Sequence, residues 1–154
     1  MLAHSFSTVL GTVTAVESEG HIVRIAFGIL PDVIEEVSDI LTETERQITE
    51  YLSGERREFT VPTLFDGSDF AKDVMEAMMR IPYGTVMTYS QLAEASGHPS
   101  AQRAVGTVCR NNPLPIIFPC HRVVPSGKGI GNYSGPSGIK EKLLKIEGFT
   151  AGDS

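Results

Sequence analysis

Tryptophan is absent from this 154-residue sequence, and only two cysteines are present. Two thiols are too few for the disulfide framework of a small secreted domain, so they indicate a reducing compartment. Long apolar runs are also missing, which argues against a membrane-spanning helix, and the first residues lack the basic and apolar regions of a signal peptide. We therefore expect a cytoplasmic protein, or a nuclear one in a eukaryote, with no membrane partner.

Positive charge is scarce in the first part of the chain. Residues 1–69 hold four arginines against thirteen acidic residues, whereas residues 100–145 hold seven Lys or Arg against one acid, Glu141. The net charge of −6 therefore hides a basic C-terminal half. A basic half beside an acidic one is typical of a local phosphate-binding surface, although an ordinary solvated surface would show the same bias.

The N-terminal part predicts a small α/β domain. Residues 5–17 and 21–27 are rich in β-branched types and predict two strands joined by a hairpin turn at the Glu-Gly pair 19–20. Residues 32–41 have a helical period, and the Thr-Glu-Thr-Glu pattern at 42–45 predicts a further, capped helix that ends at Gly54. This part shows no catalytic pattern, and the isolated His4 and His21 do not predict a metal site.

The C-terminal part predicts several helices. Asp69 can cap a helix at 70–80, a Thr-x-x-Gln capping box starts one at 88–95, and Ser100 can cap another at 101–110. A last amphipathic helix from 139 ends at Glu147. Two short helices separated by a turn that contains Gly97 make a helix-turn-helix, a common pattern that by itself is only a weak indication of DNA binding.

One apolar stretch in this part ends in a thiol. Residues 113–124 read Pro-Leu-Pro-Ile-Ile-Phe-Pro-Cys-His-Arg-Val-Val, which predicts a buried, strand-like or extended segment stiffened by three prolines. A lone buried cysteine is usually an inert core residue. His121 and Arg122 directly after Cys120 favour a reactive thiol instead, because buried polar side chains need partners and cationic neighbours lower a thiol pKa.

These residues resemble a known family. The segment PCHRV at 119–123, together with IPYG at 81–84, RAVG at 103–106, NYSG at 132–135 and Glu-Gly at 147–148, is similar to the O6-alkylguanine-DNA alkyltransferases. The resemblance covers residues 64–149 and is loose before them. It strengthens the helix-turn-helix prediction, because motif, charge and family all point to DNA.

The resemblance implies a fold of the α/β (α+β) class in two domains. Residues 1–62 would form a small ribonuclease-H-like domain of sheet and helix, and residues 63–68 a linker. Residues 69–150 would form a mainly helical, winged-helix-like domain with the helix-turn-helix, and 151–154 a tail. The implied activity is single-turnover transfer of a methyl or other alkyl group from O6-methylguanine, and from O4-methylthymine, in DNA to Cys120. No cofactor or metal is implied, and the protein would act as a monomer.

The resemblance also implies roles for individual residues. In the catalytic group, His121 would activate Cys120 through a water molecule, and Glu147 would support His121. Asn112 would brace the turn beneath the thiol, and Tyr89 would donate a proton to the departing base. The pocket for the flipped base would comprise Tyr89, Val123, Tyr133, Ser134 and Gly135.

The implied DNA-binding surface follows the second helix of the helix-turn-helix. That helix would enter the minor groove, and Arg103 would fill the gap that the flipped base leaves. Small residues on the same helix suit a close approach to a narrow groove. The full implied set is Tyr89, Ser100, Arg103, Ala104, Gly106, Thr107 and Arg110.

Several alternatives remain open from the sequence. A lesion-binding relative that does not transfer the alkyl group would share the helix-turn-helix, and a cysteine hydrolase would pair Cys120 with His98 or His121. A zinc site is weaker, because no close Cys-x-x-Cys pair is present. Cys109 is interpreted as a small buried hydrophobe. Pro136 departs from the family pattern, in which a glycine is expected, and it removes one backbone N–H from the loop.

Overall fold

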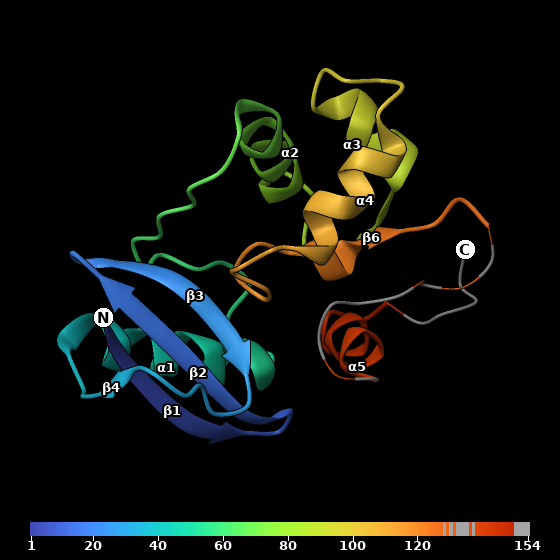
Figure 1. Ribbon diagram of the computed structural model, residues 1–154. Helices are drawn as coiled ribbons and strands as arrows, with labels where there is room; N and C mark the ends of the chain where they lie inside the picture. Colours follow the sequence, from blue (N-terminus) through green and yellow to red (C-terminus); the bar gives the residue numbers. More distant parts are fainter. Residues whose placement is uncertain (128, 130, 132–135, 137, 150–154) are drawn as a thin grey trace. The chain divides into compact units, whose positions relative to one another are not determined.

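The computed structural model describes residues 1–127, 129, 131, 136 and 138–149 (Figure 1). The chain divides into two compact units, Met1–Phe65 and Asp66–Ser154. The first is a sheet with a helix, and the second is mainly helical, so the predicted mixed α/β class is confirmed. No helix in the described part of the chain is both long enough and apolar enough to cross a membrane.

The first unit is a four-stranded sheet with one long helix. Strands β1 (Leu2–Thr8), β2 (Gly11–Ser18) and β3 (His21–Phe27) pair antiparallel, and β4 (Ile34–Glu35) pairs parallel with β1, so the order is β3-β2-β1-β4. Helix α1 (Asp39–Leu52) packs against β1 and β2 (Figure 1). The core of this unit includes Val13, Ala15, Ile22, Leu41 and Ile48.

The hairpin at 19–20 is confirmed, because Glu19 and Gly20 have φ angles of 50° and 82°. Two other local predictions were wrong. The single strand expected at 5–17 is two strands, with a turn before Gly11. The helix expected at 32–41 does not form, because Ile34 pairs with Leu2 at the sheet edge. One helix, α1, replaces it and begins after Ser38, so the capping-box pattern at 42–45 lies inside that helix.

The second unit contains four helices in its described part. They are α2 (Asp69–Met79), α3 (Tyr89–Ala95), α4 (Gln102–Arg110) and α5 (Ile139–Ile146). Helices α2, α3 and α4 pack against one another (Figure 1), and α3 with α4 forms the predicted helix-turn-helix. A short parallel pair, β5 (Met87–Thr88) with β6 (Val123–Val124), joins the start of α3 to the chain after Arg122.

The helix starts in this unit test the capping predictions. The capping box of Thr88 and Gln91 is present. The caps predicted at Asp69 and Ser100 were wrong: Ser68 caps α2, and Ala101 precedes α4 without a side-chain cap.

The apolar stretch at 113–124 is buried, as predicted, but it is not extended. Residues 114–118 form turns, and Cys120 opens a short 3-10 helix, η1 (Cys120–Arg122). Only Val123 and Val124 are in a strand. The chain turns here because Ile116 has a φ of 76°, a left-handed conformation that would not be predicted for an isoleucine.

Candidate active site around Cys120

Asn112, just after α4, holds the segment that presents the thiol. Its side-chain Nδ2 donates to the carbonyl of Phe118 at 2.9 Å, and its Oδ1 accepts from the backbone N–H of Leu114 at 2.9 Å. The Phe118 carbonyl also accepts from the backbone N–H of Cys120 at 2.7 Å. Pro119 lies between them with φ −80° and ψ 62°, which is an inverse γ-turn. Asn112 and Cys120 therefore share one carbonyl.

Neither cysteine forms a disulfide, and both are buried, Cys120 at 4% and Cys109 at 6% relative exposure. Burial, and then the neighbouring charge of Cys120, raise the pKa of Cys109 to about 12. Cys109, near the end of α4, is therefore a neutral thiol at physiological pH, in agreement with its interpretation as a small buried hydrophobe.

His121 and Glu147 form a fully buried pair. Nε2 of His121 lies 2.8 Å from Oε2 of Glu147, and neither side chain is exposed. Burial lowers the pKa of His121, while the hydrogen bond to Glu147 opposes that shift. The imidazole is therefore neutral at pH 7, and the carboxylate favours the tautomer with the proton on Nε2. Nδ1 is then the basic nitrogen of the ring.

Arg122 also binds Glu147, and the sequence did not predict this contact. Nε and Nη2 of Arg122 each lie 2.9 Å from a carboxylate oxygen, and the backbone N–H of Gly84 donates to Oε1 at 3.0 Å. Nη1 of Arg122 donates to the carbonyl of Ile81 at 2.8 Å. The Glu147 side chain is thus held from two other segments of the chain, residues 121–122 and Gly84. An arginine in a buried segment predicts a hydrogen-bonding partner, but the sequence does not indicate which residue that partner is.

Lys140 is a second cation that the sequence did not single out. It is 2% exposed, and its Nζ donates to the carbonyl of Val123 at 2.8 Å. Burial lowers the pKa of Lys140, and a charge on Cys120 opposes that shift. Lys140 lies on the apolar face of α5, three and four residues before Leu143 and Leu144, and this spacing indicates a buried side chain.

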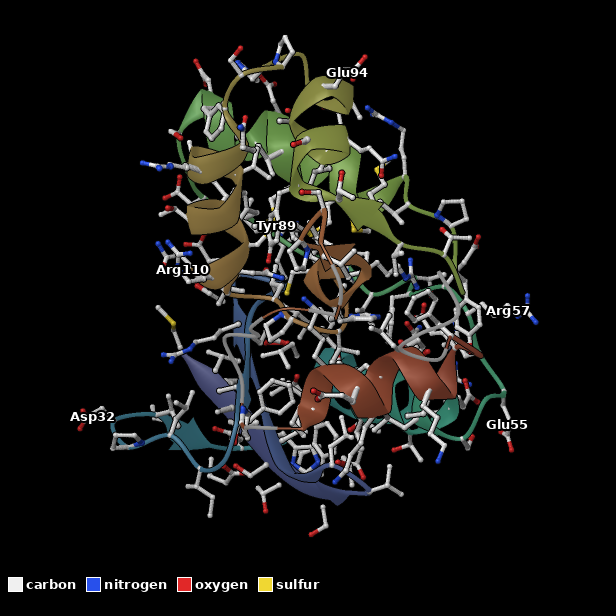
Figure 2. All side chains as sticks on the ribbon, turned by 90° about the vertical axis from the view of Figure 1, so that its right-hand side faces the viewer. Asp32, Glu55, Arg57, Tyr89, Glu94 and Arg110 are labelled. Carbon is white, nitrogen blue, oxygen red and sulfur yellow. The ribbon has the colours of Figure 1, made fainter. Side chains whose placement is uncertain are left out.

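Tyr89 begins α3 next to the second helix of the helix-turn-helix. Burial, followed by the charges of Cys109 and Cys120, raises the pKa of Tyr89, so its hydroxyl remains a proton donor at neutral pH. A Cβ added to Gly106 of α4 would lie 3.9 Å from the Tyr89 ring and 3.9 Å from Nη1 of Arg110. Tyr89 and Arg110 are labelled in Figure 2.

The outer face of α4 is open to solvent. Gly106 is half-buried, and five residues of the helix are exposed: Gln102, Arg103, Ala104, Thr107 and Arg110. Ser100 lies just before the helix and is exposed as well. The pair of β5 with β6 connects this region to the thiol, because Thr88 pairs with Val124. The structure thus brings Tyr89, Asn112, Cys120, His121, Val123 and Glu147 into one unit.

Three pocket residues of the sequence analysis, Tyr133, Ser134 and Gly135, lie outside the described residues. Val123 is fully buried. His98, named as an alternative base, bonds to Asp73 at 3.0 Å on the outside of the helices. Within the described ranges no group of three or more His, Cys, Asp or Glu side chains is arranged to hold a metal ion.

Both units of the chain match the same family of known proteins. Residues 69–149 match the family model for the DNA-binding domain of 6-O-methylguanine DNA methyltransferase, and residues 1–65 match the model for its ribonuclease-like domain. The chain is 40% identical over 119 residues to a methylated-DNA–protein-cysteine methyltransferase of Methanosarcina acetivorans, covering 77% of this chain and 76% of the relative. A relative from Archaeoglobus fulgidus with the same name is 44% identical over 114 residues, or 70% and 75% of the two chains.

A solved structure is similar over nearly the whole chain. The crystal structure of Mycobacterium tuberculosis OGT in complex with DNA has a TM-score of 0.88 and 28% sequence identity. It covers 96% of this chain and 92% of the other.

Proposed function

This chain belongs to the 6-O-methylguanine DNA methyltransferase family, whose members repair DNA by moving an alkyl group onto a protein cysteine, and we propose that this cysteine is Cys120. One observation carries the assignment. Cys120 is followed directly by a histidine whose ring is fully buried and bonded to a buried carboxylate. The other cysteine, Cys109, has a pKa raised to about 12, which makes it a poor nucleophile.

The proton of the thiol would leave through His121. The two residues are adjacent, and in this segment a water molecule between Sγ and Nδ1 is a better geometry than direct contact. The neutral ring accepts the proton at Nδ1, and the Glu147 carboxylate stabilises the imidazolium that results. Lys140, whose Nζ donates to the carbonyl of Val123, adds positive charge to the segment that follows the thiol.

The transfer itself is an in-line displacement. The Cys120 thiolate attacks the alkyl carbon of O6-methylguanine, so an S–C bond forms as the C–O6 bond breaks, and the electron pair of that bond goes to the base. Tyr89 is protonated and donates a hydrogen bond or proton to the departing base, which makes guanine a better leaving group. The product is S-methylcysteine, a thioether that water does not cleave, so each molecule reacts once. O4-methylthymine would react in the same way.

DNA is the partner of this chain. We propose that it binds through α4 in the minor groove, because the exposed face of that helix combines Arg103 and Arg110 with Ala104 and the half-buried Gly106. The damaged base would leave the stack to reach the buried thiol, at a cost of a few kcal/mol that is smallest for a damaged pair. The protein would act as a monomer in the compartment that holds the DNA, the cytoplasm or, in a eukaryote, the nucleus.

A mass measurement tests the assignment of the acceptor. We would incubate the protein with a duplex that carries one O6-methylguanine, digest it with trypsin, and weigh the peptide 111–122. A gain of about 14 Da on Cys120 that saturates at one per protein is expected. An unmodified peptide from protein still bound to the lesion would favour the non-transferring relative. No binding and no gain would leave the cysteine hydrolase as the next function to test.

The role of Arg103 is tested separately. Arg103→Ala should slow repair in duplex DNA much more than reaction with free O6-benzylguanine, because only the duplex requires base flipping. Arg80→Ala is the matched control, since Arg80 is an exposed arginine at the end of another helix, α2. Equal losses of Arg103→Ala in both assays would contradict the proposed role.

A further inference from the structure

Ile116 lies four residues before the thiol in a backbone conformation that its residue type disfavours. Its φ is 76°, in the left-handed region. Two other described non-glycine residues, Glu19 and Asp32, also have positive φ, and both are exposed and lie between strands. Ile116 differs from them because it is β-branched and only 1% exposed. A β-branched residue in this region is a rare outlier, because its branched Cβ crowds the backbone.

The left-handed residue lies in the middle of the turn that leads to Cys120. The backbone N–H of Phe118 donates to the carbonyl of Leu114 at 2.8 Å, which closes the turn around Ile116. The turn thereby positions Phe118, whose carbonyl accepts from Nδ2 of Asn112 and from the backbone N–H of Cys120. The conformation of Ile116 is therefore connected to the position of the thiol through one carbonyl group.

We propose that Ile116 is a positioning residue for alkyl transfer. The left-handed φ of Ile116 turns the chain back toward Asn112. The buried side chain of Ile116 and the two hydrogen bonds of Asn112 hold the turn in this conformation, which an isolated peptide would not keep. This inference rests on the proposed function, because it matters for the reaction only if Cys120 is the acceptor. The strained residue lies four positions before Cys120, where a small change in a backbone angle would move the thiol.

The test compares two truncations at two neighbouring positions. Ile116→Ala and Ile116→Gly remove similar buried volume, but glycine adopts a positive φ freely and alanine does not. Ile117 is the matched control, because it is also a buried isoleucine, at 4% exposure, and its φ is not positive. Single-turnover rates of methyl transfer would be measured with saturating duplex, along with the dissociation constant for the duplex and the fraction of protein that reacts.

We expect the order of the two truncations to reverse between the positions. At 116 the glycine variant should transfer the methyl group at least about fivefold faster than the alanine variant, whereas at 117 alanine should be equal or better. The dissociation constant should stay the same within each pair. A merely structural loss would lower the reacting fraction and leave the rate of the folded molecules unchanged.

Three further variants separate the possible failures. If both truncations at 116 fail to fold, Ile116→Leu and Ile116→Val replace them, and the leucine variant, unbranched at Cβ, should keep the rate better than valine. Alanine equal to or faster than glycine at 116, or valine equal to or faster than leucine, would overturn the proposal. Methyl transfer that persists in Cys120→Ser would instead overturn the choice of acceptor, whatever the variants at 116 do.

Discussion

Removal of the Arg122 guanidinium should destabilise the second unit strongly. In Arg122→Ala, the fully buried Glu147 loses two hydrogen bonds of 2.9 Å and its cationic partner, and the carbonyl of Ile81 loses a third bond. Breaking a buried ion pair from one side costs about 3–5 kcal/mol, because an uncompensated charge remains in the interior. That is a large share of the ~5–15 kcal/mol by which domains are stable.

Urea unfolding of the purified protein measures this loss. The control is Arg80→Ala, because Arg80 lies 3.6 Å from Glu76 in an exposed pair, which should contribute less than about 1 kcal/mol. The double variant Arg122→Ala/Glu147→Gln should lose less than the two single losses together, since the amide leaves no buried charge. A loss below about 1 kcal/mol for Arg122→Ala, similar to the control, would refute the argument that Glu147 depends on this pair.

Three further outcomes follow from the same region. Because burial lowers the pKa of His121 below 6.5, the unfolded chain takes up a proton that the folded protein does not. The free energy of unfolding should therefore fall as the pH decreases below 6.5, by up to about 1.4 kcal/mol per pH unit, and thermal melts of His121→Gln should lack that slope. Gly84→Ala places a Cβ 3.1 Å from the carbonyl oxygen of Glu147 at a φ of 79°, and it should destabilise more than Gly54→Ala, where φ is 84° and the space is open; equal denaturation midpoints would contradict this. Gly106→Ala should raise stability by about 0.5–1 kcal/mol, as alanine does inside a helix, while weakening binding to duplex DNA in a fluorescence titration; unchanged binding would argue against a close approach at α4.

The sequence predicted best where the structure is decided locally. The capping box of Thr88 and Gln91 closes within three residues, and the hairpin at 19–20 depends on two neighbouring φ angles. Both could be predicted from the residues alone. The helix expected at 32–41 fails for the opposite reason. Its apolar period is real, but pairing with β1, a distant segment, draws Ile34 into a strand, and tertiary contacts outweigh the period.

The candidate site was likewise predicted only in part, with its residues found and their long-range contacts missed. The thiol and the polar residues after it were visible in the sequence, and the resemblance suggested Glu147. The contacts of Glu147 with Arg122 and Gly84 could not be predicted, because they join residues that are 25 and 63 positions apart in the sequence. The extended conformation expected at 113–124 was wrong before Val123, since no rule of residue preference assigns a left-handed φ to a buried isoleucine such as Ile116.

The distance along the chain between Glu147 and its partners has a consequence for biosynthesis. His121 and Arg122 leave the ribosome 26 and 25 residues before the carboxylate that they bind. At about 5–20 residues per second, roughly one to five seconds pass between synthesis of the thiol and synthesis of the carboxylate that binds His121. A ribosome-bound chain that stops before Glu147 should therefore carry Cys120 as an ordinary thiol. On the mechanism proposed above, the irreversible reaction would begin only after the chain has been synthesised through Glu147, the residue that follows α5.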